Sequence, residues 1–289
     1  MSPTDSFDRD AYLSRLAVEL EPPSAEALFR LHRAHVERVP YETLWIFLGE
    51  RWTVDARRSA ARIATQARGG YCYHLNGALS ELLRSLGYSV TRHVGGVHGP
   101  GGASQDAMSN HLVLTVRDLP TDDNPGGVWY VDAGLGDALH EPLPLVSGAC
   151  DQGPFHLLLA QTPDGVGDWH LTHDPSGSFA GMSWRSARVE MDAFAERHGW
   201  LSTSPESGFV RVLSAQRRDA TGVDVLRGLT LKRIGERATE SIITTPTELA
   251  DALADVFGLD IGRAGEQARS KLWTRVHAAH LEWEATGRA

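Results

Sequence analysis

The stretch RGGYCYHLNGALSELLRSLGYSV, residues 68–90, contains Cys72, one of the two cysteines of the chain. Leucines recur there at the three- and four-residue spacing of one buried helix face: Leu75, Leu79, Leu82, Leu83 and Leu86. The spacing predicts a helix over 72–86, which Gly87 ends. Gly69 and Gly70 allow a sharp turn just before the helix. Cys72 is therefore expected in the first helical turn.

Cys72 at that position has two explanations. The helix dipole and the unpaired N–H groups of a first turn stabilise a negative charge, so a thiolate there would be available as a nucleophile. Cysteine is also among the residues that proteins bury most often as a small apolar side chain. The stretch alone favours neither explanation, because a nucleophile needs a base and a group that orients the base.

Two later stretches, 110–116 and 128–132, have the composition of β-strands. The residues between them, 117–127, are rich in Pro, Asp, Asn and Gly, which is typical of a loop that joins an antiparallel pair. The pattern predicts a hairpin whose open end carries a histidine and an aspartate.

The register of this hairpin decides whether the two polar residues meet. If Val116 pairs with residue 127 or 128, His111 lies opposite Asp132 or Ala133, and directly opposed Cβ atoms are about 4.5–5.5 Å apart. A carboxylate at that distance would orient the imidazole and stabilise its charged form. A histidine at a strand end and an aspartate that opens a turn are also common structural features, and the register does not place Cys72 beside them.

The order of the predicted elements indicates an α+β fold with segregated layers. Helices are predicted over Asp10–Leu20, from Ser24 onward and over Ala56–Ala67. Short strands and turns are predicted from residue 89 to about 212. Near the C-terminus, the stretch 245–258 begins with a Thr-Pro-Thr-Glu capping box and ends with glycine, which predicts a helix within a mixed tail.

Composition narrows the class of protein. The 289 residues carry a formal net charge of −9 without a Lys/Arg run, which argues against a nucleic-acid partner. No stretch approaches the ~18 apolar residues of a membrane span, and the N-terminus lacks the pattern of a signal peptide. The two cysteines, Cys72 and Cys150, form no CxxC pair, so no metal site is expected and a cytoplasmic location is predicted.

Taken together, the motifs resemble those of one known family, the arylamine N-acetyltransferases. RGGYCYHLN resembles that family's signature around its cysteine, NHLVLTV the segment with its histidine and WYVDAGLG the segment with its aspartate. VPYETL (39–44) and LSTSPESGFV (201–210) are similar to two further blocks. The blocks stand in the family's order and cover most of the chain.

The resemblance implies that Cys72 is the acylated nucleophile, His111 the base and Asp132 the carboxylate that orients it. It implies ping-pong transfer of an acetyl or other acyl group from acetyl-CoA to an arylamine or hydrazine, without a metal. It also implies three parts: a helical domain (1–88), a β-barrel-like domain (89–205) and an α/β lid (206–289), with a cysteine-hydrolase-like core.

Four other residues match positions that the family uses near its site. Glu42 and Arg68 match a charged pair that braces the site. Thr203 and Ser204 match a segment near the coenzyme and are expected to bind it, although ordinary turn capping would explain them equally well.

Three positions depart from the family pattern. His74 stands where the family often has Glu or Gln, either as a neutral buried histidine or as a second titrating group. Leu135 replaces a frequent Phe of the acceptor pocket and is expected to contact the substrate, and Thr43 replaces a frequent Asn. His74 and Leu135 bear on substrate preference more than on reaction type.

Other functions use the same residues. An amide synthase of a biosynthetic pathway would take its acyl group from an acyl carrier protein, and His74 and Leu135 are compatible with such larger acyl groups. A hydrolase would let water attack the acyl-enzyme. A binding protein without catalytic activity would not need all three of Cys72, His111 and Asp132. The natural amine, the preferred donor and the oligomeric state are not determined by the sequence.

Overall fold

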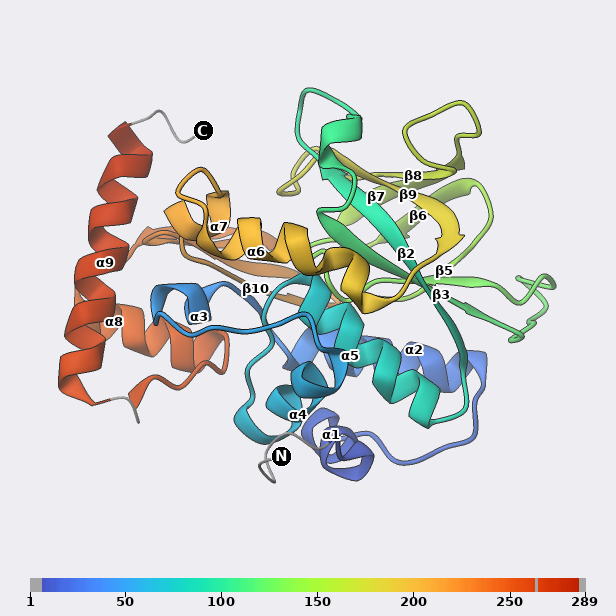
Figure 1. Cartoon of the computed structure of the whole chain (residues 1–289), viewed down its shortest axis with the longest axis horizontal. Helices are drawn as coiled ribbons and strands as arrows, with labels where there is room; N and C mark the ends of the chain where they lie inside the picture. Colours follow the sequence, from blue (N-terminus) through green and yellow to red (C-terminus); the bar gives the residue numbers. More distant parts are fainter. Residues whose placement is uncertain (1–6, 263–264, 286–289) are drawn as a thin grey trace.

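The computed structural model describes residues 7–262 and 265–285, in which helices and two sheets surround one buried helix (Figure 1). The α-helices of these ranges are α1 (Arg9–Leu16), α2 (Ala25–Arg38), α3 (Leu44–Phe47), α4 (Ala56–Gln66), α5 (Cys72–Ser85), α6 (Ala195–Thr203), α7 (Gly208–Arg211), α8 (Pro246–Asp251) and α9 (Glu266–Ala285). Three short helical segments accompany them: η2 (Gln105–Ala107), η3 (Met191–Phe194) and η4 (Ala252–Val256). No helix of the described ranges is long and apolar enough to cross a bilayer.

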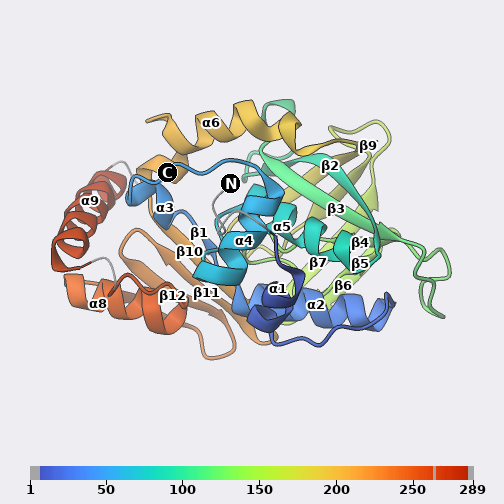
Figure 2. The ribbon, with the colours of Figure 1, turned by 60° about the horizontal axis from the view of Figure 1, so that its bottom comes forward.

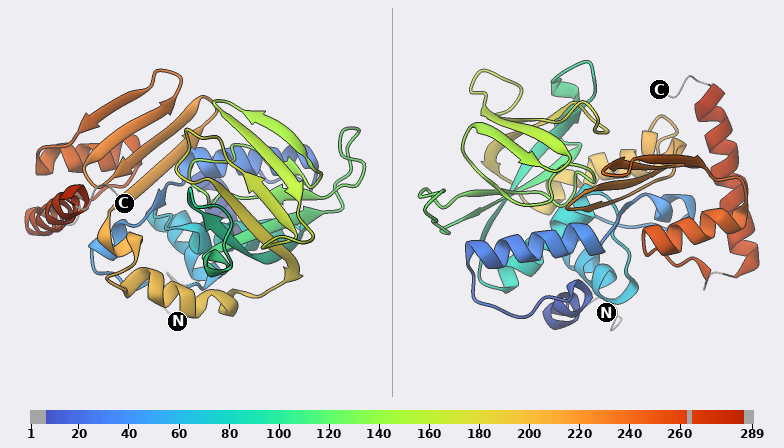
Figure 3. Two further views of the ribbon diagram at one scale, coloured as in Figure 1. Left: turned by 90° about the horizontal axis from the view of Figure 1, so that it is seen from above. Right: turned by 180° about the vertical axis from the view of Figure 1, so that it is seen from behind.

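The larger sheet has eight antiparallel strands in the order β5-β4-β3-β2-β9-β8-β7-β6 and curls into a half-barrel (Figure 3). Its strands are β2 (Ser89–His98), β3 (His111–Arg117), β4 (Trp129–Val131), β5 (Leu143–Pro144), β6 (Gly148–Gln152), β7 (Phe155–Gln161), β8 (Trp169–Thr172) and β9 (Gly181–Arg188). The smaller sheet runs β1-β10-β11-β12-β13. Its strands are β1 (Tyr41–Glu42), β10 (Ser214–Asp219), β11 (Gly222–Arg227), β12 (Thr230–Gly235) and β13 (Thr239–Ile242).

Helix α5 lies between the two sheets, with α6 along one side and α8 and α9 beside the smaller sheet (Figure 2). Strand β3 is buried on both faces, which explains why its sequence is almost continuously apolar. Leu112 and Leu114 join the core formed with the helices, whereas Val113 joins the interior of the half-barrel. Strand β3 therefore connects the two cores and fixes the position of its first residue, His111.

The interior of the half-barrel follows a period of two. In β7, Phe155, Leu157 and Leu159 are buried, while His156 and Leu158 between them are exposed. The predicted α+β class is confirmed, since the mixed architecture has a curled sheet and separate helical layers.

The predicted central helix is confirmed almost to the residue. Helix α5 begins at Cys72, and Gly87 follows its last turn with a φ of +94°. Ser24 caps α2 by accepting a hydrogen bond from the Ala27 N–H at 3.1 Å. Thr245 likewise caps α8, but Glu248 reaches back to the backbone N–H of Thr244 instead of closing the box on Thr245.

Two boundary predictions are wrong. Helix α1 ends at Leu16 instead of Leu20, since Ala17 takes a left-handed conformation and Leu20, 57% exposed, offers no buried contact for a further turn. The predicted strands up to residue 212 are replaced by η3, α6 and α7 over residues 191–211. A helical signal is present there in four buried residues at three- and four-residue spacing: Met191, Phe194, His198 and Leu201.

Candidate active site

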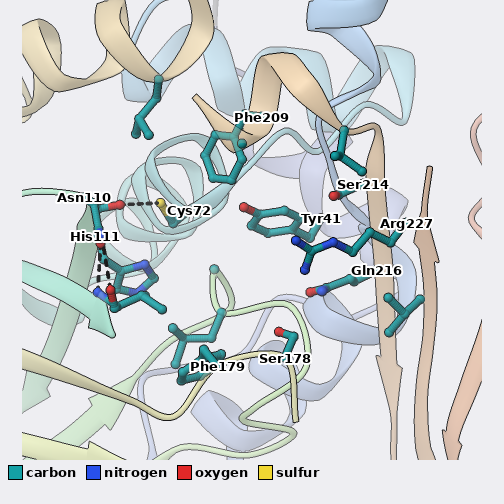
Figure 4. Close-up of a pocket in the computed structure, with 17 residues that line it drawn as sticks. Tyr41, Cys72, Asn110, His111, Ser178, Phe179, Phe209, Ser214, Gln216 and Arg227 are labelled. Carbon is teal, nitrogen blue, oxygen red and sulfur yellow. Dashed lines mark hydrogen bonds between the residues drawn. The ribbon is translucent and has the colours of Figure 1, made fainter. Parts of the chain in front are cut away.

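Cys72, His111 and Asp132 meet at the N-terminus of α5; Figure 4 shows the first two. Asp132 directly follows β4, and its Oδ2 lies 2.7 Å from Nε2 of His111, the first residue of β3. The Cys72 thiol lies 3.6 Å from the backbone carbonyl of Asn110, the residue before His111. All three side chains are nearly inaccessible, with 3%, 1% and 1% of the residue surface exposed. The structure thus brings together the three residues predicted for catalysis.

The hairpin achieves this through a different register from the one predicted. Val116 pairs with Trp129, and the ladder between the two strands ends with Leu114 opposite Val131. Continued to the strand end, this register would set His111 opposite Gly134, so Asp132 is its diagonal neighbour on the same face of the sheet. A long imidazole spans a diagonal pair, which is why a shift of two residues preserves the contact, whereas a shift of one would put Asp132 on the opposite face.

Asp132 is a buried carboxylate with all its lone pairs in use. Besides His111, its Oδ2 accepts a hydrogen bond from the Tyr130 hydroxyl at 2.9 Å. Its Oδ1 accepts from Nδ2 of Asn76 at 2.7 Å and from the backbone N–H of Gly134 at 2.9 Å. Four donors make up for the water that the carboxylate loses on burial.

Asn76 connects three segments of the site. Its Nδ2 also donates to the carbonyl of Leu112 in β3 at 2.6 Å, and its Oδ1 accepts from the backbone N–H of Ala133 at 2.9 Å. Because Asn76 lies one helical turn after Cys72, it ties the helix of the cysteine to the strand of the histidine and to the turn of the aspartate.

His111 is held in its charged form. Burial lowers its pKa, but the adjacent Asp132 carboxylate and Cys72 side chain, each also hydrogen-bonded to the imidazole, raise the pKa to about 10. The arrangement therefore favours a protonated imidazole beside the sulfur of Cys72.

Two glycines permit this close approach. Gly70, with a φ of +85°, takes a left-handed conformation that a residue with a side chain rarely adopts. A Cβ at Gly134 would lie 2.8 Å from the Cα of Cys72, so the turn after Asp132 can contact the helix only without a side chain.

The predicted Glu42–Arg68 pair braces the loop before Cys72. Nε of Arg68 lies 3.0 Å from Oε1 of Glu42, whose side chain is fully buried. The backbone N–H of Glu42 donates to the carbonyl of Gly70 at 2.9 Å, so the pair fixes the turn that leads into α5. One oxygen of Glu42 also accepts from the N–H of Trp45 at the start of α3.

A cavity of about 340 Å³ opens beside the three residues. Cys72, His111 and Asn110 line one end. Its apolar wall includes Leu135 and four further side chains: Val97, Phe179, Leu201 and Phe209. Leu135 therefore lies where a pocket residue was predicted, and the volume suits a small organic molecule.

Thr203 and Ser204 do not line this cavity. The Thr203 hydroxyl donates to the carbonyl of Gly199 within α6, and the Ser204 hydroxyl accepts from the N–H of Glu206. Both side chains thus make the local capping contacts that were the alternative explanation. Their predicted contact with a coenzyme stays a prediction.

His74 lies behind the site in a cluster of aromatic rings, Trp45, Trp52, Tyr71 and His198. It is fully buried and does not line the cavity. Burial lowers its pKa well below the usual value, Arg62 and His198 lower it further, and the Thr53 backbone opposes them weakly. His74 is therefore neutral, in line with the structural explanation, and not a second titrating group at neutral pH.

Sequence reasoning assigned no role to several residues that the site uses. Asn76 stood in the quoted signature, and its spacing of four from Cys72 was the available signal. Tyr130 precedes Asp132 by two, the spacing of one strand face. Tyr41, in the quoted block VPYETL, reaches the cavity from the smaller sheet together with Gln216 and Arg227, which had no local signal.

Among residues 7–262 and 265–285, no three His, Cys, Asp or Glu side chains gather as ligands of a metal ion. Both cysteines are free thiols. The residues gathered at the N-terminus of α5 could supply a cysteine nucleophile and a histidine that transfers its proton.

The chain is similar to known proteins over most of its length. A family model described as N-acetyltransferase matches residues 24–265. The arylamine N-acetyltransferase of Mycolicibacterium smegmatis is 29% identical over 286 residues, covering 92% of this chain and 98% of the relative. A pineal gland arylamine N-acetyltransferase of Gallus gallus is 29% identical over 250 residues, covering 79% and 83%.

The fold of this chain is similar to that of solved arylamine N-acetyltransferase structures. Mycobacterium marinum arylamine N-acetyltransferase in complex with CoA has a TM-score of 0.81 and 26% identity, covering 93% of this chain and 98% of that one. The arylamine N-acetyltransferase from Salmonella typhimurium has a TM-score of 0.78 and 25% identity, covering 96% and 99%.

Asp132→Asn should neutralise His111. The substitution removes the carboxylate that raises the pKa of His111 most, while burial, which lowers it, persists, so the pKa should fall well below about 10. NMR titration of the imidazole would report the change. In the wild type, the stabilisation from charged His111 is complete below pH 6.5 and is lost as the pH rises toward 10.

The free energy of unfolding supplies a second readout for this substitution. The difference in the free energy of unfolding between wild type and Asp132→Asn should shrink as the pH rises from 6.5 toward 10. His74→Gln, a change of another buried imidazole, should leave the His111 titration unchanged. A His111 pKa that is equal in wild type and Asp132→Asn would contradict the assignment.

Asn76→Ala should lower both stability and the reactivity of Cys72. It removes one hydrogen-bond partner from the Leu112 carbonyl, the Ala133 N–H and the Asp132 carboxylate, at about 1–3 kcal/mol for each buried group that is left unsatisfied. Loss of positioning should slow alkylation of Cys72 by iodoacetamide by about 10- to 100-fold. Asn124→Ala, which removes a hydrogen bond to the Val128 carbonyl in a distant loop, is the control. It should lower stability only; equal alkylation rates for Asn76→Ala and wild type would refute a positioning role.

Proposed function

The chain belongs to the arylamine N-acetyltransferase family, and from that premise we propose that it transfers an acetyl group from acetyl-CoA to the nitrogen of an arylamine or hydrazine. The observation that carries the proposal is the meeting of Cys72, His111 and Asp132 beside a cavity of small-molecule size, which Cys72 and His111 line. These are the three roles that acyl transfer through a cysteine requires.

In the proposed first half-reaction, the Cys72 thiolate attacks the carbonyl carbon of acetyl-CoA. A new C–S bond forms to Cys72, the bond to the coenzyme sulfur breaks, and His111 gives its proton to the departing thiolate. The raised pKa of His111, about 10, keeps that proton available at neutral pH.

In the second half-reaction, the amine nitrogen attacks the thioester carbonyl. Neutral His111 takes a proton from the nitrogen, the C–S bond to Cys72 breaks, and the thiolate and imidazolium are restored. Asp132 stays ionised throughout and holds the imidazole by the 2.7 Å contact to Nε2.

The position of the cavity supports transfer to an amine over hydrolysis. Cys72 has 3% of its surface exposed, and Phe209, Leu135 and Phe179 form apolar walls beside it. Walls of this kind limit the access of water to an acyl-enzyme while a flat organic acceptor is bound.

We also retain the three-part organisation 1–88, 89–205 and 206–289, with a cysteine-hydrolase-like core, as a proposal. The arrangement of a helix N-terminus against a strand that carries the histidine supports it.

Acetyl-CoA is the donor that we propose, because a named structural relative was solved with CoA. Thr203 and Ser204 remain proposed coenzyme contacts on the strength of the motif alone. Nothing in the comparisons supports a carrier-protein partner. A cytoplasmic location stays a prediction, which the need to keep the Cys72 thiol reduced supports.

Acetylation of Cys72 tests the function directly. Incubation with acetyl-CoA should add one acetyl mass on the peptide that contains Cys72, and Cys72→Ser should abolish the addition. Cys150→Ser is the matched control and should retain it, because burial raises the pKa of the Cys150 thiol and disfavours its thiolate. Acetylation of Cys150 in place of Cys72 would overturn the assignment. Acylation by a carrier-bound thioester without reaction with acetyl-CoA would instead indicate an amide synthase.

Leu135→Phe tests what sets the acceptor preference. A ring at this wall of the cavity would stack on an aromatic amine, and aromatic pairs add about 0.5–1.5 kcal/mol beyond burial. The ratio of kcat/KM for a simple arylamine to that for a bulky amine should rise by a few-fold, up to about tenfold. Leu158→Phe, at a leucine of β7 that is 44% exposed and outside the cavity, is the control. An unchanged or lower ratio in Leu135→Phe would show that Leu135 does not set specificity.

A further inference from the structure

The part of the cavity away from Cys72 is polar and comes from one face of the smaller sheet. Gln216 of β10 pairs with Tyr41 of β1 on one side and with Val225 of β11 on the other, and Ser214 pairs with Arg227. Residues that are directly opposed, or two apart along one strand, share a sheet face. The register therefore gathers these five residues on one surface, and all five line the cavity.

Arg227 is an available cation on this surface. Its guanidinium lies 5.5 Å from the ring centre of Trp283, and no described residue gives it a hydrogen bond or an ion pair. Figure 4 shows the guanidinium directed toward Tyr41 and Gln216, across the cavity from Cys72. Contact with an aromatic face leaves the N–H groups of an arginine free to bind an anion.

Polar groups without partners surround the guanidinium. Within residues 7–262 and 265–285, the side chains of Tyr41, Ser214, Gln216 and Ser178 make no hydrogen bond to the protein. Burial and the nearby charge of Cys72 raise the pKa of the Tyr41 hydroxyl, so it remains protonated as a donor. Asp137, a carboxylate whose charge acts on Tyr41, accepts from the N–H of Ser178 and does not line the cavity.

We propose that Arg227 selects acceptors with a carboxylate, so that the amine of the acceptor reaches Cys72 while its carboxylate pairs with the guanidinium. This inference rests on the proposed acyl transfer at Cys72 and names the class of acceptor. The planar fork of arginine matches a carboxylate with two parallel hydrogen bonds. The rings of Phe209, Phe179 and Tyr41 between the two ends suit the aromatic body of such a molecule.

A phosphate of the donor is the other anion that could meet Arg227. The pantetheine arm separates the phosphates of CoA from the thioester by many bonds, whereas Arg227 and Cys72 line one cavity of about 340 Å³. A compact acceptor therefore matches the arrangement better than the distant phosphates do.

Two acceptors of nearly the same shape test the proposal: 4-aminobenzoate, which carries the charge, and 4-aminobenzamide, which does not. Each is added to enzyme that acetyl-CoA has already acetylated, so that only the second half-reaction is measured. The wild type should favour the carboxylate, and Arg227→Met should reduce this preference by about tenfold. Arg227→Lys, which keeps the charge but loses the fork, should fall between the two.

Arg217→Met is the matched control. Arg217 follows Gln216 in β10, projects from the other face of the sheet and does not line the cavity, so its loss should leave the preference unchanged. Titration of the two acceptors into Cys72→Ala protein should show the same dependence on Arg227 in binding, independent of turnover.

Three results would overturn the proposal. An unchanged ratio in Arg227→Met or a wild type without preference for the carboxylate would remove the role of Arg227 in acceptor choice. A slower acetylation of Arg227→Met by acetyl-CoA, with normal acetylation by 4-nitrophenyl acetate and an unchanged acceptor ratio, would assign Arg227 to the donor's phosphates. Failure of Cys72 to become acetylated is a separate observation and would refute the proposed function itself.

Discussion

The active site depends on the burial of one ionised carboxylate, Asp132. A carboxylate without water must find other donors, and here a side chain of α5, a tyrosine of β4, the turn after β4 and the imidazole of β3 supply them. Each donor belongs to a different segment, so satisfying the charge also fixes how these segments lie. The same charge holds His111 protonated against the effect of burial. The buried Asp132 carboxylate therefore both fixes the packing of these segments and sets the protonation state of His111.

The loop before α5 has to match that arrangement closely. The buried Glu42–Arg68 pair and the hydrogen bond from Glu42 to Gly70 hold the turn from which Cys72 starts the helix. The turn after Asp132 meets the helix without room for a side chain at Gly134. A change at either contact would move the thiol relative to the imidazole, although neither residue carries chemistry itself.

The sequence predicted the parts of the site that local patterns determine. Leucine spacing predicted α5 and the place of Cys72, and strand composition predicted the hairpin of His111 and Asp132. The exact register was missed, since it depends on packing of both faces of β3, and the diagonal contact tolerated the error. The helices of residues 191–211 were missed because a turn-rich composition hid four residues at helical spacing. Arg227 and Gln216 could not be assigned, because their position depends on how the smaller sheet lies against α5.

The two ends of the cavity come from different structural layers, and this separates reaction from recognition. Cys72, His111 and Asp132 belong to α5 and the larger sheet, where buried hydrogen bonds leave little freedom for substitution. The opposite wall belongs to β10 and β11, where the side chains that face the cavity make no hydrogen bonds within the described structure. Replacing such side chains removes no internal hydrogen bond, so it should alter the shape and charge of the cavity at little cost to the fold. A scaffold built in this way can keep one acyl-transfer mechanism while its acceptor changes.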